Sequence, residues 1–222
     1  MNKYSVIIAT MWKDVPSLQK MVSIYNESDW VGEILIVNNR NTIFNSLWLP
    51  EYKKIKMFTP QSNLFVNPSW RYAVQQAQYE RVIIVNDDIV IKTNFNTLMQ
   101  QVDAVLKSNV IIGFDESCFP QRDKYTGTKK EIKITEDKNK TQLYGFGVFM
   151  VLFAKDFYVP YQMKVWYGDM YLFRNLIPFT IKGTTVVTIM GTTTSTMATD
   201  LQPQKEKEKL YYQQNKNLFR HE

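Results

Sequence analysis

Short, continuously apolar runs alternate with segments of helical periodicity through the first half of the chain, and this alternation constrains the fold most strongly. The runs at 6–9, 34–37 and 82–85 contain no polar side chain, which is typical of strands buried on both faces. Between them, apolar residues at 15–25 and 67–77 recur every three or four positions, which predicts amphipathic helices. We therefore predict an α/β fold whose mainly parallel central sheet is flanked by helices.

The second half of the chain does not show this alternation of strand-like and helical segments. Residues 121–140 are polar and have no clean period, which predicts a loop or a loose hairpin. The other expected elements are strands at 55–58, 110–114 and 147–153, a helix at 95–107, two β-branched runs within 179–190 parted at Gly183, and a polar terminal helix at 202–219 packing through Leu210, Tyr211 and Leu218. Because the sequence shows neither an internal repeat nor a Gly/Ser-rich linker, we expect a single domain spanning 1–222.

The composition limits the partners and the compartment that the chain suits. A net charge of +6 favours an anionic partner, such as a nucleotide diphosphate, a nucleic acid or a membrane surface, and selects none of them. Cys118 is the only cysteine, so no internal disulfide is possible. No signal peptide and no apolar stretch of about 18 residues is present. We therefore expect a cytoplasmic protein with no transmembrane segment.

Polar side chains follow the predicted strands at the point where three of them end. These are Thr10, the triplet at 38–40 and the triplet at 86–88. In open α/β sheets, ligands bind beyond the carboxyl ends of the parallel strands. Thr10 and Asn39 are thus candidates for binding a nucleotide base or ribose, with turn formation as the alternative.

Two adjacent carboxylates, Asp87 and Asp88, follow the buried run at 82–85. Like charges this close raise one pKa or require a cation. A hard cation such as Mg²⁺ or Mn²⁺, held also by substrate phosphates, meets that requirement. The alternative is that the pair caps the next turn and faces water.

Four segments between about residues 4 and 92 resemble glycosyltransferases of the GT-A fold, most closely the family-2-like group. They are the strand Ser5 to Thr10, the strand Glu33 to Arg40, the stretch from Asn63 through Asn67 to Ala73, and the strand Val82 to Ile89 with Asn86-Asp87-Asp88 at its end. The resemblance implies a nucleotide-diphospho-sugar transferase-like domain that uses Mn²⁺ or Mg²⁺. It implies Asp88 as a direct metal ligand and Asn86 as a further oxygen donor. Nucleotide-sugar binding would fall to Thr10, Asn39, Asn63, Trp70 and Asp87.

Asp169, in the segment 165–172, matches the family position of an acid at the start of a helix, after the acceptor-side strand. The resemblance implies that Asp169 is the catalytic base of an inverting reaction. A hydroxyl acceptor is a poor nucleophile near neutral pH, so a carboxylate within hydrogen-bond reach is chemically required. The alternative is that Asp169 is only a helix N-cap.

The aromatic side chains near these positions have two interpretations. Trp70, Trp166, Tyr167 and Tyr171 either form a stacking wall for a sugar or a base, or belong to the core. Many members of the family complete the metal shell with a histidine, but Gly191 stands where this residue is expected. The only histidine is His221, next to the last residue, and it could reach the metal only if the tail folds back.

These observations predict a metal-dependent glycosyltransferase, either hexosyl- or pentosyltransferase. It would move a sugar from a nucleoside-diphosphate sugar donor to a glycan or another hydroxyl acceptor. We expect a nucleotide-sugar-binding half at about 1–115, an acceptor-side half at about 116–200 and a C-terminal helix at about 201–222. Two alternatives stay open. One is transfer to a modified base in nucleic acid, although the sequence lacks the clustered Lys/Arg stripe that would bind a duplex. The other is a non-catalytic binding protein on a degenerate transferase fold.

Overall fold

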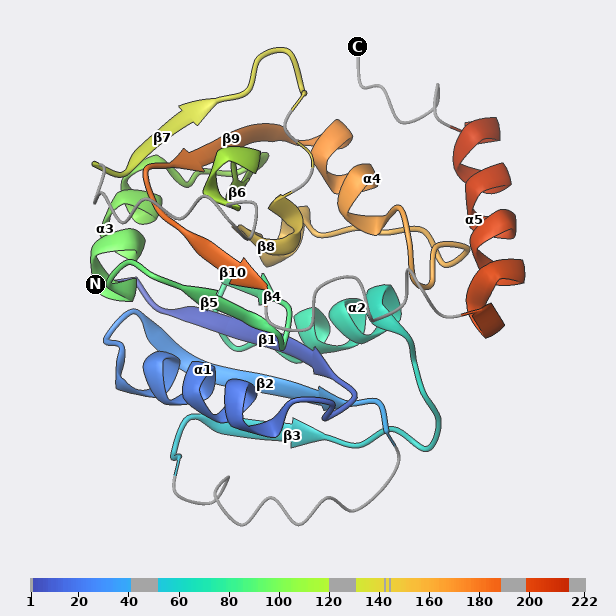
Figure 1. Ribbon diagram of the computed structural model, residues 1–222, viewed down its shortest axis with the longest axis horizontal. Coiled ribbons are helices and arrows are strands. Elements are labelled where there is room, and N and C mark those ends of the chain that lie inside the picture. Colours follow the sequence, from blue (N-terminus) through green and yellow to red (C-terminus); the bar gives the residue numbers. More distant parts are fainter. Residues whose placement is uncertain are drawn as a thin grey trace.

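A computed structural model describes residues 2–40, 52–119, 131–141, 143, 145–188 and 199–215. Within these ranges the chain folds around an eight-stranded sheet of order β3-β2-β1-β4-β8-β6-β9-β7 (Figure 1). Its strands are β1 (Tyr4–Thr10), β2 (Val31–Asn38), β3 (Ile55–Phe58), β4 (Arg81–Val85), β6 (Val110–Phe114), β7 (Lys133–Glu136), β8 (Gly145–Phe153) and β9 (Ile177–Lys182). The short strands β5 (Ile89–Ile91) and β10 (Val186–Thr188) pair separately and antiparallel.

The sheet is mixed, where the sequence predicted one that is mainly parallel. β1, β2, β3 and β4 are parallel neighbours, and so are β6 and β9. β8, however, lies between β4 and β6 and is antiparallel to both, and β7 is antiparallel to β9. The physical reason is that β8 returns along β6 from the edge at which β6 ends, so it runs in the opposite direction.

The strands are buried on both faces, as the apolar runs predicted. In β1, Val6 and Ile8 contribute to one core cluster and Ile7 to the other. The same alternation holds in β2 and β4, because successive side chains of a strand point to opposite faces. The predicted strands at 6–9, 34–37, 55–58, 82–85, 110–114 and 147–153 are confirmed.

Helices cover the two faces in separate groups. Residues of α1 (Val15–Glu27) and α3 (Phe95–Val105) belong to the first core cluster. Residues of α2 (Val66–Gln76), α4 (Gly168–Asn175) and α5 (Gln202–Asn215) belong to the second. Asp14 is the N-cap of α1, and its carboxylate accepts a hydrogen bond from Ser17 N. None of the helices in the described ranges has the length and apolar character needed to cross a membrane.

The second half of the described chain contains two strands separated at Gly183 and a C-terminal helix. The β-branched runs parted at Gly183 are β9 and β10; Gly183 has φ +83, and a Cβ there would overlap the carbonyl of Glu131. The terminal helix begins at Gln202, but the prediction that Leu210 packs it is wrong, since Leu210 is 56% exposed. The prediction is confirmed for Tyr211, which packs against the second core cluster, and the fully or nearly fully buried residues of the helix are Glu208 and Tyr212. Leu218 and residues 121–130 lie outside the described residues.

Candidate functional site

Three strand ends meet at the carboxyl edge of the parallel strands. Thr10 ends β1 and pairs with Asn38 at the end of β2, while β4 on the other side of β1 leads into Asn86, Asp87 and Asp88. The Thr10 hydroxyl donates to Asp87 Oδ2 at 2.6 Å, and Asn39 N donates to the Thr10 carbonyl at 2.9 Å. The backbone of Asn86 is held by Val148 of β8, whose carbonyl accepts from its N–H at 3.0 Å. The polar residues predicted at these strand ends are therefore brought together.

The two carboxyl groups are poorly solvated. Asp88 is 6% exposed. Burial, and then the charges of Asp87 and Asp14, raise the pKa of Asp88 to about 6. Burial also raises the pKa of Asp87, although the hydrogen bond from Thr10 acts in the opposite direction. Carboxylates in such a setting gain stability from a nearby cation.

The chemistry of these donors fits a hard divalent cation. The side chains of Asp88 and of its sequence neighbours Asp87 and Asn86 carry the oxygen ligands that Mg²⁺ and Mn²⁺ prefer. Within the described residues, no group of three or more His, Cys, Asp or Glu side chains could hold a metal. Phosphate oxygens of a donor would have to supply further ligands. β10 ends at Thr188, which pairs with Ile89, the residue that follows Asp88. Gly191 and His221, the two positions considered for a further metal ligand, lie outside the described residues.

The other predicted nucleotide-sugar residues occupy different settings. Asn39 is buried and its side chain is hydrogen-bonded to Ser69 Oγ at 2.9 Å and to Leu64 N at 3.1 Å. Asn63 is exposed and accepts a hydrogen bond from Phe65 N at 2.7 Å. Trp70 is 4% exposed and belongs to the second core cluster. Trp70 therefore has almost no surface for a ligand, and the core interpretation holds for it.

Asp169 lies in the first turn of α4. The helix begins at Gly168 and its N-cap position is Tyr167, so the alternative that Asp169 is the N-cap is wrong. Burial raises the pKa of Asp169, while hydrogen bonds from its own and the Met170 backbone N–H lower it. A carboxyl group with a raised pKa is a stronger proton acceptor than an ordinary one, which suits a general base.

The first turn of α2 connects the strand ends to the start of α4. Ser69 is hydrogen-bonded to Asn39 at the end of β2. Two residues earlier, Asn67 N donates to the Lys164 carbonyl at 2.9 Å, and Asn67 Nδ2 donates to the carbonyls of Met163 and Trp166 at 3.3 and 3.1 Å. A Cβ at Gly168 would overlap Asn67 Oδ1, so only glycine fits there without a shift.

The first turn of α2 is therefore bonded both to Asn39, after β2, and to the segment that leads into Asp169. Sequence reasoning included Asn67 and Ser69 in a matching segment but gave them no function. Both residue types are common at helix starts, which hid their connecting role.

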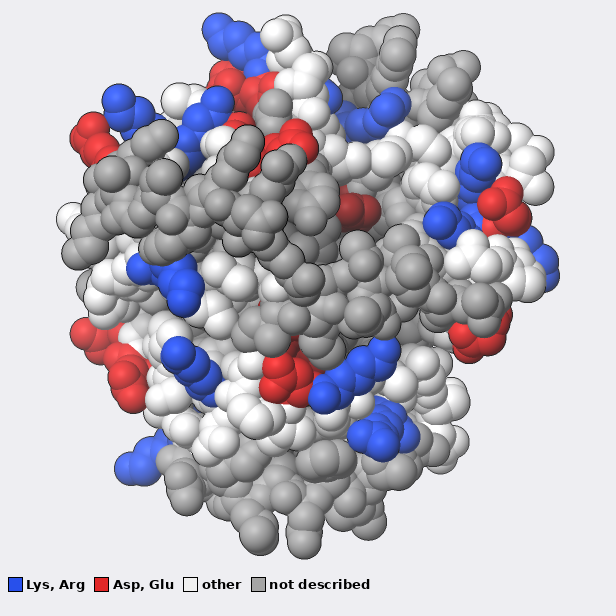
Figure 2. All heavy atoms as spheres, in the orientation of Figure 1, with Lys and Arg blue, Asp and Glu red and all other residues white. Residues whose placement is uncertain are grey.

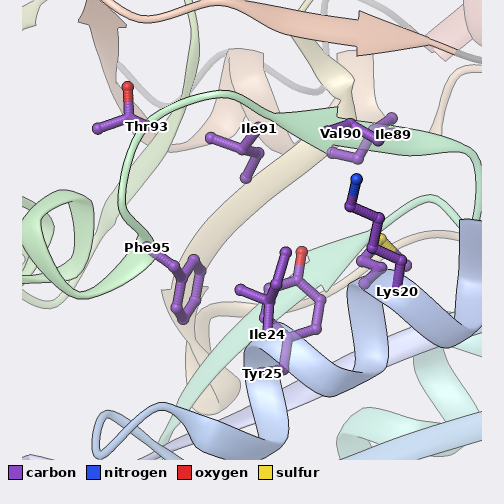
Figure 3. A pocket seen from close by; sticks show the side chains of 9 residues that line it. Lys20, Ile24, Tyr25, Ile89, Val90, Ile91, Thr93 and Phe95 are labelled. Carbon is purple, nitrogen blue, oxygen red and sulfur yellow. The ribbon is translucent and has the colours of Figure 1, made fainter.

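A separate depression lies between α1 and β5 (Figure 3). Its lining is mainly apolar, with Ile24, Tyr25, Ile91 and Phe95 among its side chains and the Lys20 ammonium at its margin. Such a lining does not suit a nucleoside diphosphate. We therefore assign the candidate site to the polar strand ends and not to this depression.

The charges on the face shown in Figure 2 are mixed. Among the described residues there, lysine and arginine side chains are interspersed with aspartate and glutamate, and they form no stripe of one sign. A duplex nucleic acid is usually bound by a basic stripe or patch. This face therefore offers nothing that favours a nucleic-acid acceptor.

The fold is similar to those of known glycosyltransferase structures. The structure of GalNAc-T7 with UDP, GalNAc and Mn²⁺ matches 98% of this chain and 50% of its own, at 13% identity and a TM-score of 0.64. TarS 1–349 of S. aureus matches in complex with UDP (78% of this chain and 54% of its own, 17% identity, TM-score 0.55) and with UDP-GlcNAc (80% and 55%, 15%, 0.56).

This chain thus spans about half the length of these proteins. Its sequence matches no protein-family model and no curated protein. The likeness in three dimensions, together with the α/β sheet and its polar carboxyl edge, establishes that the chain has the GT-A fold.

Proposed function

We propose that this protein is a glycosyltransferase that moves a sugar from a nucleoside-diphosphate sugar to a hydroxyl acceptor, with Mn²⁺ or Mg²⁺ bound at Asp88. The observation that carries the proposal is the pair Asp87 and Asp88 at the carboxyl end of β4, where burial raises the pKa of both carboxyl groups. In similar folds, GalNAc-T7 is bound to UDP and Mn²⁺, and TarS to UDP-GlcNAc. A uridine donor is therefore the first to test.

The residues divide between the two substrates. Thr10 and Asn39, at the ends of β1 and β2, would contact the nucleoside. Asn63 would join them from the exposed stretch before α2, where the next residue, Leu64, donates its N–H to Asn39 Oδ1. Asp87 would contact the ribose or the sugar. Asp88 would hold the cation, with Asn86 as a further oxygen donor. When bound, the cation would neutralise the charge of the diphosphate leaving group.

Asp169 is proposed as the general base. An acceptor hydroxyl attacks the anomeric carbon and its proton passes to the Asp169 carboxylate. The bond from the anomeric carbon to the phosphate oxygen breaks, and the nucleoside diphosphate leaves with the electron pair. Attack from the face opposite the leaving group inverts the anomeric configuration. The acceptor is a glycan or another hydroxyl compound.

A thermal-shift experiment tests the donor site. UDP-GlcNAc and UDP-GalNAc are added to the protein with and without Mn²⁺. A ligand at about 100 times its Kd stabilises the folded state by about 2.7 kcal/mol, which raises the Tm of a chain of this length by about 5–11 °C. We expect this rise only when nucleotide sugar and Mn²⁺ are both present.

Two variants make the result specific. Asp88→Asn should abolish the metal-dependent rise, because it removes the proposed ligand charge while keeping the side-chain shape. Asp29→Asn, at an exposed aspartate before β2, should show the same rise as the wild type. If neither nucleotide sugar shifts the wild-type Tm with Mn²⁺, or if Asp88→Asn responds like the wild type, the proposed site is wrong.

A further inference from the structure

The segment 163–168, which leads into Asp169, depends on its neighbours for its conformation. It contains no helix or strand before α4 begins at Gly168. Its last residue before the helix, Tyr167, has φ 64 in the left-handed region. A non-glycine residue in this region is uncommon and persists where surrounding contacts hold it. The position of Asp169 is therefore set by the elements that contact this segment.

One of these elements is α5, through Glu208. The Glu208 side chain is fully buried, at 0% exposure, in a helix that is otherwise largely polar and exposed. Its carboxylate accepts hydrogen bonds from Trp166 N at 2.8 Å and from Val165 N at 3.2 Å, and also from Gln204 Nε2 at 2.7 Å. A buried carboxylate is costly unless its hydrogen bonds are satisfied. Here it supplies the acceptor for two consecutive backbone N–H groups.

A second residue of α5 contacts the same segment one turn further along. The Tyr212 ring stacks on the Tyr167 ring, with 5.0 Å between centroids and 17° between planes. Residues four apart lie on the same face of a helix, so Glu208 and Tyr212 form one face directed at 165–167. In Figure 1, α5 stands beside α4 and the chain that enters it. Asn67 of α2 holds the same segment through its bonds to Met163, Lys164 and Trp166.

We infer that Glu208 is a positioning residue for Asp169, so that the C-terminal helix α5 keeps the general base in its working orientation. The inference rests on the proposed function of Asp169 and adds a residue to which neither the sequence patterns nor the resemblance drew attention. Among the described residues, the hydrogen bonds of the Glu208 carboxylate go to the backbone N–H groups of Val165 and Trp166 and to Gln204, so we infer that it acts on the reaction through the segment 163–168. Thr10 and Asp88 form no hydrogen bond or ion pair with the described residues of α5, so we expect the effect to be confined to the transfer step.

The test compares three variants of the full chain with the wild type. Glu208→Ala removes both acceptor oxygens, and Glu208→Gln keeps one of them. Glu206→Gln removes the same charge from an exposed position of the same helix, and serves as the matched control. Circular dichroism and the Tm are measured for each, and the assays are run at a temperature at which all variants are folded.

Three quantities are then measured with Mn²⁺ present: kcat for UDP release from UDP-GlcNAc or UDP-GalNAc, the Kd for UDP, and the rate of amide hydrogen exchange in 163–168. We expect Glu208→Ala to lower kcat about tenfold to a hundredfold, as a displaced catalytic group would, with the Kd for UDP unchanged. Amide exchange in 163–168 should accelerate. Glu208→Gln should recover part of kcat, and Glu206→Gln should equal the wild type.

The outcomes separate the inference from the proposed function. If Glu208→Ala keeps the wild-type kcat while Asp169→Asn loses activity, the base is right and the positioning role is wrong. If kcat and UDP affinity fall together in Glu208→Ala, the residue is only structural. If Asp169→Asn is as active as the wild type, or the wild type releases no UDP, the proposed function fails. The exchange rates then still decide whether Glu208 holds the segment.

Discussion

Replacing Asp88 with asparagine should stabilise the metal-free protein above neutral pH. Burial, followed by the neighbouring charges of Asp87 and Asp14, raises the pKa of Asp88 from its ordinary value of 3.8 to about 6. Each pKa unit between the folded and unfolded states corresponds to about 1.4 kcal/mol. The ionised Asp88 side chain therefore destabilises the folded state by about 3 kcal/mol, and asparagine has no charge to bury.

The sign of the pH dependence follows from the same pKa values. The folded state binds the Asp88 proton more tightly than the unfolded state does, so the stability of the wild type falls as pH rises between about 4 and 6. Below about pH 4 the carboxyl group is protonated in both states, and the variant should have no advantage. Above about pH 7 the full difference of about 3 kcal/mol should be present.

Urea unfolding in the presence of a chelator measures this difference across a pH series. The corresponding rise in Tm at about pH 8 is about 6–12 °C for a domain of this length. Asp29→Asn removes an exposed charge and is the control, for which little change is expected. If Asp88→Asn and the wild type are equally stable at both the acidic and the basic end of the pH series, burial of the ionised Asp88 carboxylate does not destabilise the folded state, and the reasoning is refuted. Replacing the chelator with Mn²⁺ and a nucleotide sugar, UDP-GlcNAc or UDP-GalNAc, should then stabilise the wild type and leave Asp88→Asn unchanged.

Two further substitutions test the contacts that assemble the site. Thr10→Val removes the donor to Asp87 Oδ2 and the acceptor of the Trp12 N–H. We expect the free energy of unfolding, measured in urea, to fall by about 1–3 kcal/mol. Thr10→Ser keeps the hydroxyl and should retain most of the stability. Gly168→Ala would push a methyl group into Asn67 Oδ1, so we expect a loss of about 1–3 kcal/mol with faster amide exchange in 163–168. Wild-type stability of Gly168→Ala would mean that Asn67 does not pack against the start of α4.

The part of the fold that was predictable is the part set by local pattern. Runs such as 6–9 and 82–85 are apolar on both faces, and that feature alone marks a strand covered by helices on both sides. The antiparallel direction of β8 was not predictable in this way. The run at 147–153 has the same apolar character as β1, because the burial of a strand does not depend on the direction in which it is paired. Its place between β4 and β6 depends on contacts far apart in the sequence.

The same distinction between local pattern and long-range packing applies to the candidate site. Thr10 is the last residue of β1, and Asn39 and Asp87 come within two residues of the ends of β2 and β4. The edge of the sheet at which they lie can therefore be predicted from the strand pattern and the rule for open sheets. Trp70 shows the limit of this approach, since an aromatic residue at helical spacing can face a ligand or the core, and here it faces the core. Glu208 is the opposite case. In the polar sequence of α5 it resembles its exposed neighbours, and only tertiary packing distinguishes it.

The contacts of α2 explain how the end of β2 and the segment before Asp169, which are far apart in sequence, keep a fixed relative position. Ser69 is bonded to Asn39 at the end of β2, and Asn67 is bonded to the segment before Asp169. Both side chains belong to one turn of one helix, so a shift of that turn would move the donor edge and the start of α4 together. α5 contacts the same segment through Glu208, and its described residues form no hydrogen bond with Thr10 or Asp88. Disturbing α2 should therefore impair donor binding and transfer together, whereas disturbing α5 should impair transfer alone.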